Sequence, residues 1–395
     1  MTQGRTAQLV IVLAVVAMGL ISVLATWSSP ATSSDAATSA PTTLVPRPTS
    51  TTATPVTTVA SSTPDPAPST TGTEGPPETT GPTTTAVPPD PYAWMDLVGT
   101  PGTTFVGVST ANGELAEVEE FSRATGVDPE VVMISRDWAT PDFDLTTIEQ
   151  ITAAGHLPMI AWEPWDHTVE STFDRRRGEQ PEYALARIIA GDFDEEIEQW
   201  AAGLAEWDRP VAIRFAHEMN GYWYPWAEST NGNRSGQYVA AWRHVHDIFT
   251  RAGADQVIWV WNPNLDDPNL TPLEGLYPGD DYVDWVGLVG YLGNGIDPSV
   301  YVPTFDQLFG PTIDIVRSFT DRPIVITEIG ATEDGGQKAG WISHVIDAIA
   351  SRSDVVGFIW FEVDKETDWR VVSSPEALEA FTDAVSDPRL GIPRS

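Results

Sequence analysis

Two glutamates stand at the ends of otherwise apolar runs. Glu218 follows a run that contains Arg214 and His217, and Glu328 follows four strand-forming residues, 324–327. A carboxylate at the end of a buried strand is destabilising unless it is solvated, paired or functional. On residue type alone two explanations stay open. The glutamates form ion pairs at the rim of the fold, with Arg214 as one partner, or they are two carboxyl groups that do chemistry.

Tryptophan is abundant, with 16 residues in the chain, and several of them lie near the ends of predicted strands. Aromatic rings offer a large contact area at low entropic cost, and they can stack on the C–H faces of sugar rings. The alternative is that single rings fill the core. Considered together, the tryptophans near strand ends predict a sugar-binding surface at one rim of the fold. It is formed by Trp162, Trp223, Trp226, Trp261 and Trp360, with Asn262 beside Trp261.

The elements that must position these residues alternate between short β-rich runs and helical patterns. The runs predict eight strands, at 104–109, 131–136, 157–163, 211–217, 257–262, 285–291, 324–329 and 355–362. Helices are predicted at 115–125, 145–154, 195–206, 237–252, 312–319, 338–351 and 375–386, and the link from the fifth strand to the sixth is irregular. Such alternation predicts parallel βαβ units, and eight of them close an α/β fold of the (β/α)8 (TIM) barrel type. An open doubly wound sheet is the alternative, but the Gly-rich phosphate loop expected of it is missing.

In such a barrel, chemistry takes place at the carboxyl ends of the strands. Glu218 follows the fourth strand and Glu328 ends the seventh, so the two side chains should face each other across the mouth. Glycoside hydrolysis needs two carboxyl groups, and retaining enzymes hold them about 5–5.5 Å apart. The pattern is compatible with that chemistry.

Two segments resemble glycoside hydrolase family 26: 214–226, which contains His217-Glu218-Met219-Asn220-Gly221, and 325–330, which contains Thr327-Glu328-Ile329-Gly330. The resemblance extends over about 95–390. It implies a retaining enzyme that cleaves a β-linked polysaccharide by a two-glutamate double displacement, as an endo-β-mannanase or a mixed-linkage β-1,3-1,4-glucanase. β-1,3-Xylanases are a rarer activity of the family.

The resemblance also implies roles for individual residues. Glu218 is expected to be the acid/base and Glu328 the nucleophile. His217 is expected to contact the sugar or to tune Glu218, and Tyr291 to donate a hydrogen bond to Glu328. Trp223 and Trp226 are expected to shape the subsites, and Trp360 to form the floor of the central one. Apart from the resemblance, an attacking carboxylate needs donors, and Arg214 and Tyr291 are the two candidates to support Glu328.

Composition excludes several other classes of function. The formal net charge of −35 opposes binding to a phosphate backbone, so no nucleic-acid partner is expected. There is no cysteine, which excludes disulfides and thiolate metal sites. His217-Glu218 lacks the second histidine of the zinc-protease motif, because position 221 is glycine. We expect no metal, no cofactor and a monomer.

The first 91 residues differ in composition from the rest. The apolar run 9–26 predicts a signal peptide or, preferably, an uncleaved signal anchor within 1–27. Residues 28–91 are rich in Thr, Ser and Pro and predict a disordered linker. The hydrolase domain is therefore expected at 92–395, extracellular or on the cell surface, and attached to the membrane if the helix is not cleaved.

Two other functions stay open. One is a catalytically inactive carbohydrate-binding relative, although such a protein usually loses at least one of the two glutamates. The other is a cell-surface partner that processes the exopolysaccharide of the producing cell. The identity of the β-glycan and the choice between endo and exo action do not follow from the sequence.

Overall fold

The computed structural model describes residues 90, 92–140, 143, 145–169 and 178–393. The predicted N-terminal helix, and all but one residue of the predicted linker, lie outside this range. Both segments and the domain boundary at 92 therefore stay predictions. Among the described residues, no helix is both long and apolar enough to cross a membrane.

Eight parallel strands form a closed barrel in chain order, with β8 hydrogen-bonded to β1. They are β1 (Phe105–Thr110), β2 (Val131–Asp137), β3 (Leu157–Glu163), β4 (Val211–Phe215), β5 (Val257–Trp261), β6 (Trp285–Leu292), β7 (Ile324–Ala331) and β8 (Val355–Glu362). The predicted strands differ from these by at most two residues at either end. The prediction of a (β/α)8 barrel is confirmed.

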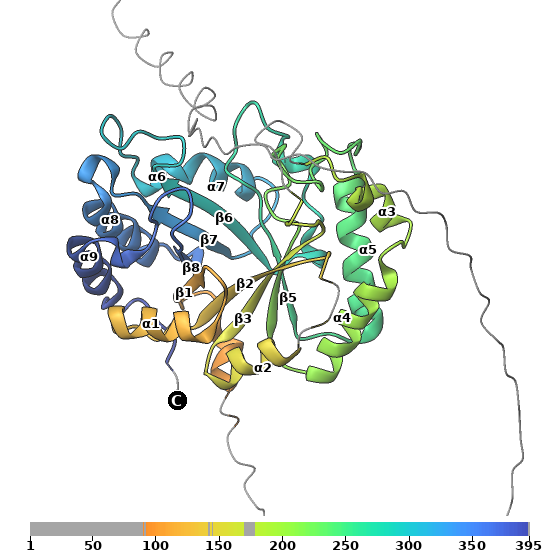
Figure 1. Cartoon of the computed structure of the whole chain (residues 1–395), viewed down its shortest axis with the longest axis horizontal. Coiled ribbons are helices and arrows are strands. Elements are labelled where there is room, and N and C mark those ends of the chain that lie inside the picture. The colour runs from red at the N-terminus through yellow and green to blue at the C-terminus, as the bar shows by residue number, and fades with distance from the viewer. Residues whose placement is uncertain (1–89, 91, 141–142, 144, 170–177, 394–395) are drawn as a thin grey trace, which may run out of the picture. The chain divides into compact units, whose positions relative to one another are not determined.

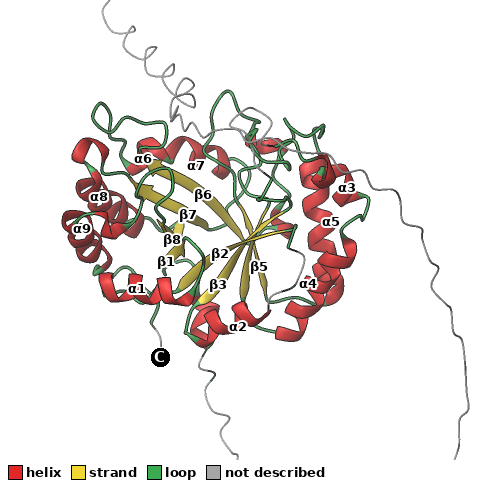
Figure 2. Cartoon of the chain, in the orientation of Figure 1, coloured by secondary structure: helices red, strands yellow, loops and turns green. Residues whose placement is uncertain are grey.

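Helices surround the barrel, as Figures 1 and 2 show. They are α1 (Leu115–Thr125), α2 (Leu145–Ala153), α3 (Leu185–Ile189), α4 (Asp194–Trp207), α5 (Gln237–Ala252), α6 (Phe305–Leu308), α7 (Gly310–Arg317), α8 (Lys338–Ala350) and α9 (Pro375–Val385). The short helices α3 and α6 were not predicted. The irregular link from β5 to β6 has two 3-10 turns, Leu273–Gly275 and Asp280–Tyr282, in place of an α-helix.

Local sequence explains where several helices begin and end. The Ser374 hydroxyl accepts a hydrogen bond from the Ala377 N–H, and Pro375 occupies the first turn of α9, where a missing N–H does no harm. Thr304 and Gln307 form a capping box at the start of α6. Helix α1 ends at Gly126, whose φ of 73° lies in the left-handed region.

The strands bury both of their faces. Successive side chains of a strand point to opposite sides, so alternate residues enter two different apolar layers. One layer fills the barrel interior and includes Val131, Met133, Met159, Ala212 and Val260. The other lies between the strands and the helices and includes Ile134, Ile160, Trp162, Ile213 and Phe215. This alternation decides which side chains at the strand ends reach the mouth of the barrel.

Candidate active site

The chain leaves β4 by an unusual backbone path that positions Glu218. Ala216 and Glu218 both have positive φ, 45° and 53°, a region that non-glycine residues rarely adopt. Hydrogen bonds hold this path, because the Ala216 N–H donates to the Trp162 carbonyl (3.0 Å) and the Glu218 N–H donates to the Asn262 carbonyl (2.6 Å). The neighbouring ends of β3 and β5 therefore fix the segment that carries Glu218.

A bulge in β7 positions Glu328. Leu288 of β6 pairs with Ile326 and Val289 pairs with Glu328, so Thr327 is an extra residue on β7. Val325 belongs to the interior layer, and strict alternation would turn position 328 toward the helices. The bulge reverses that direction, so Glu328 faces the mouth of the barrel. The Thr327 hydroxyl lies 2.5 Å from Asn262 Oδ1 and 3.1 Å from the Leu288 carbonyl, two acceptors that share its proton, and these contacts hold the bulge.

Two donors hold the Glu328 carboxylate. Arg214 Nη1 lies 2.7 Å from Glu328 Oε1, and the Tyr291 hydroxyl donates to Oε2 at 2.5 Å. The Arg214 side chain is 1% exposed, and Asn262 Oδ1 accepts a hydrogen bond from its Nε at 2.5 Å. A buried guanidinium paired in this way is a strong, directional partner for a carboxylate.

Glu218 has a different environment. Trp223 Nε1 donates to its Oε2 at 2.8 Å. Burial, and next the charge of Glu328, raise the pKa of Glu218 to about 7, although Arg214 and the hydrogen bonds from Trp223 and Asn264 lower it. Glu218 is thus a carboxyl group that is protonated through much of the weakly acidic range.

Neighbouring groups stay in one protonation state. Burial, and next the Glu328 charge, raise the pKa of Tyr291 well above 10, so its hydroxyl remains a donor. Burial, and next the Arg214 charge, lower the pKa of His217 well below 6.5, so its imidazole is neutral. His217 Nε2 lies 3.3 Å from the Tyr224 hydroxyl, and Trp226 Nε1 donates to the His217 carbonyl at 2.6 Å.

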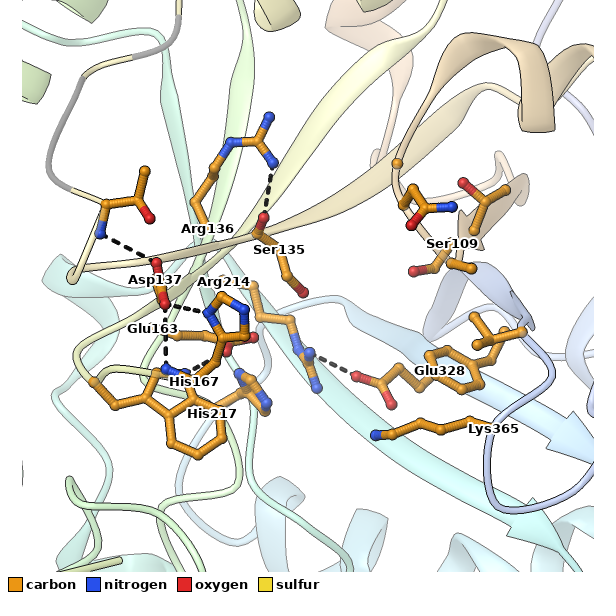
Figure 3. A pocket seen from close by; sticks show the side chains of 18 of the residues that line it. Ser109, Ser135, Arg136, Asp137, Glu163, His167, Arg214, His217, Glu328 and Lys365 are labelled. Atoms are coloured by element: carbon orange, nitrogen blue, oxygen red, sulfur yellow. Dashed lines mark hydrogen bonds and ion pairs between the residues drawn. The ribbon is translucent and has the colours of Figure 1, made fainter. Parts of the chain in front are cut away.

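A cavity of about 940 Å³ opens beside these groups (Figure 3). Its described lining includes Arg214, His217 and Glu328, while Glu218 stands outside that lining. The rest of the wall comes mainly from the ends of β1, β2, β3 and β8 and the loops that follow them, including Ser109, Ser135, Asp137, Glu163, Trp165, Phe361 and Lys365. The cavity is wide enough for sugar rings.

The prediction that all five tryptophans form sugar platforms is wrong for four of them. Trp162, Trp226, Trp261 and Trp360 are 0% exposed and belong to the layer between the barrel and the helices. In the strands, alternation explains the burial. At the end of β3, Trp162 points outward and the next residue, Glu163, reaches the cavity. Trp360 points outward against Phe381 of α9, and Phe361 takes the cavity side.

The remaining predicted residues divide into two groups. Asn262 is also 0% exposed, so its predicted contact with substrate is wrong. It accepts from Arg214 and from the Thr327 hydroxyl, and so positions groups around the site. Trp226 stacks on Tyr224, with ring centroids 4.3 Å apart, and holds His217 through the hydrogen bond to its carbonyl. Trp223, His217 and Tyr291 remain next to the two glutamates, and their contact with substrate stays a prediction.

Sequence reasoning missed Glu163, Trp165, Tyr224 and Phe361, all of which line the cavity. The signal that was available for Glu163 and Phe361 was the two-residue period of β3 and β8. Within the described part of the chain, no group of three or more His, Asp or Glu side chains could hold a metal ion.

Comparisons with known proteins agree with this geometry. The model of glycosyl hydrolase family 26 matches residues 119–334. Endoglucanase H of Acetivibrio thermocellus is 35% identical over 285 residues, which is 70% of this chain and 30% of that protein. Mannan endo-1,4-beta-mannosidase A and B of Caldalkalibacillus mannanilyticus is 31% identical over 196 residues, 48% of this chain and 34% of that protein. The chain thus spans about a third of the length of these relatives.

Among solved structures, a GH26 β-mannanase from Bacteroides ovatus has the same fold. It aligns with a TM-score of 0.55 at 18% identity, over 74% of this chain and 90% of that one. The catalytic domain of an endo-β-1,4-mannanase from Bacillus sp. JAMB-750 also gives 0.55, over 76% and 90%. The family match over more than half of the sequence decides the assignment, and the chain belongs to glycosyl hydrolase family 26.

Proposed function

We propose that this protein is a retaining hydrolase of a β-linked polysaccharide, with Glu328 as nucleophile and Glu218 as acid/base. One observation supports this most strongly. The two glutamates interact electrostatically, yet one is held by a guanidinium and a phenol while the pKa of the other is raised to about 7. A double displacement requires this arrangement, in which donors hold the attacking carboxyl group and a neighbouring carboxyl group of raised pKa can supply a proton.

The reaction has two steps. Glu328 attacks the anomeric carbon, the bond to the leaving oxygen breaks, and the proton of Glu218 passes to that oxygen. Glu218, now ionised, takes a proton from water, whose oxygen attacks the anomeric carbon and releases Glu328. The Tyr291 hydroxyl and the Arg214 guanidinium position the Glu328 carboxylate for attack, and Trp223 orients the proton on Glu218.

For the substrate, we propose a β-glucan cleaved internally, with β-mannan as the second candidate. The relative that matches 70% of this chain is named an endoglucanase, whereas the mannosidase matches 48%. Because the sequence has an N-terminal apolar run followed by a linker, we propose that the enzyme acts outside the cell. We also propose that it is a monomer and needs no cofactor.

The test is reducing-sugar release by the full-length chain from mixed-linkage β-glucan, galactomannan, β-1,3-xylan and the exopolysaccharide of the producing organism. Glu218→Gln and Glu328→Gln serve as controls. We expect release from β-glucan that both substitutions abolish, and a product whose first-formed anomer is β by NMR. Release only from the exopolysaccharide would favour the processing role. Binding without release would favour a carbohydrate-binding relative, and a first-formed α anomer would exclude the retaining mechanism.

A further inference from the structure

Besides Glu328, the carboxyl groups of Asp137 and Glu163 line the cavity, and the mechanism uses neither. Glu163 is the last residue of β3 and is 9% exposed. Trp165 Nε1 donates to its Oε2 at 2.8 Å, and its carbonyl accepts from the Trp138 N–H (3.0 Å) and the Trp165 N–H (2.9 Å). Both the backbone and the carboxyl group of Glu163 are therefore held in one orientation.

This carboxyl group is destabilising where it stands. Burial raises its pKa to about 7, although the hydrogen bonds from Trp165 and Ser135 and the Arg214 charge lower it and the charge of Glu328 raises it again. The ion pair of Arg214 goes to Glu328, and Figure 3 shows Arg214 between the two carboxyl groups. The Trp165 contact alone does not require a carboxyl group, because an amide oxygen would accept the same bond without a charge to desolvate.

The side of the cavity on which Glu163 lies follows from the two glutamates. In the proposed reaction, the sugar that becomes attached to the enzyme lies against the nucleophile, and the departing sugar lies beside the acid/base. Glu163 lines the cavity together with Glu328, and the charges of Arg214 and Glu328 act on its carboxyl group. Glu163 therefore lies on the glycone side, where the sugar becomes attached to Glu328.

We propose that Glu163 is a specificity-determining residue that accepts a hydrogen bond from a free hydroxyl of the neutral sugar bound on the glycone side. This inference rests on the proposed function. A carboxylate accepts several hydrogen bonds, so those from Trp165 and Ser135 leave capacity for a sugar hydroxyl. The hydroxyl supplies the compensating partner that a buried carboxylate needs.

The test uses an aryl β-disaccharide, whose aryl group fills the leaving-group side so that only glycone contacts remain. We expect Glu163→Gln to lower kcat/KM on this substrate by about 10- to 100-fold, the amount typical of a lost charged hydrogen bond. The amide keeps an oxygen for Trp165, so the fold should persist, as checked by thermal unfolding. Glu198→Gln, at an exposed position of α4, is the matched control and should change nothing.

A second experiment uses a series of aryl glycosides that each lack one hydroxyl of the glycone sugar. It distinguishes recognition of one hydroxyl by Glu163 from a purely structural role of Glu163. We expect the loss caused by Glu163→Gln to vanish on the substrate that lacks the recognised hydroxyl and to persist on the others. An equal loss on every substrate, or no loss on the parent, would overturn the inference. If instead the unmodified enzyme cleaves no β-glycoside at all, then it is the proposed function that fails.

Discussion

The ends of β4 and β7 each present a glutamate to the mouth of the barrel, but the two glutamates have different surroundings. At the end of β7, a bulge aims Glu328 at two fixed donors, Arg214 at 2.7 Å and Tyr291 at 2.5 Å. At the end of β4, a strained backbone presents Glu218 to two uncharged donors, the Trp223 indole and the Asn264 amide, and burial raises its pKa to about 7. The difference is what the proposed roles require, because the surroundings, and not the residue type, distinguish a nucleophile from a proton donor.

The largest expected effect comes from replacing each glutamate in turn. Glu328→Gln should lower kcat more than about 10⁴-fold on every substrate, because no other group replaces the attacking oxygen. Glu218→Gln should lower kcat on polysaccharide by a similar factor. On an aryl glycoside with a good leaving group, the first step of this variant should keep most of its rate, because that leaving group needs no proton. Burst kinetics with a dinitrophenyl glycoside measure that step. Equal loss of the burst in both variants would contradict the assignment of roles.

Removing one donor to Glu328 should have the next largest effect. Tyr291→Phe deletes only the hydroxyl that binds Oε2, so kcat should fall on the order of 10²-fold with little change in KM. Tyr277→Phe is the matched control, because the Tyr277 hydroxyl binds Asp280 and Thr320 outside the cavity lining. A loss of the same size in the control would mean that the phenol at position 291 has no specific role.

Weakening the contact at Glu218 should shift a pH profile. The alkaline limb of kcat/KM should reflect the pKa of about 7 of Glu218, with activity lost as pH rises. The Trp223 hydrogen bond lowers this pKa, so Trp223→Phe should raise it and move the limb to higher pH. Trp341→Phe, whose indole binds the distant Pro303 carbonyl, should leave the limb unchanged. A shift to lower pH in Trp223→Phe would contradict this account of Glu218.

The smallest expected effect concerns stability. The pKa of Glu218 is raised in the folded state, so between its unfolded value near 4.5 and about 7 the folded state binds more protons. The free energy of unfolding should therefore fall as pH rises through that window. Glu163, Glu196 and Glu362, whose pKa values burial likewise raises to about 7, add to the slope, whereas His217, whose pKa burial lowers, opposes part of it. Thermal unfolding should give a higher Tm at pH 5.5 than at pH 8, and Glu218→Gln should reduce the difference. A Tm difference that Glu218→Gln leaves unchanged would contradict this contribution of Glu218.

The strand order could be predicted because eight buried runs, separated by helical patterns, fix the topology. The same runs predict that Glu218 follows the fourth strand and that Glu328 lies at the end of the seventh. The orientation of single side chains was harder. Trp162 and Trp360 were placed at the mouth because they stand near strand ends, although a two-residue period points them toward the helices. The same period would have identified Glu163 and Phe361.

Other features of the site depend on tertiary structure. The bulge at Thr327 turns Glu328 inward, and strict alternation along β7 would have sent this residue to the wrong side. The positive φ of Ala216 and Glu218 is set by hydrogen bonds to Trp162 and Asn262 on neighbouring strands. Neither feature has a local sequence signal, because each arises from a partner that is distant in the chain.

The most direct test of the central claim is to trap the glycosyl-enzyme. A 2-deoxy-2-fluoro β-glycoside with a good leaving group slows release, so the attached sugar can be located by peptide mass spectrometry. The account predicts one added sugar per chain, bonded to Glu328, and none in Glu328→Gln. A sugar bonded to Glu218 or Glu163, or turnover with no attached sugar, would contradict it.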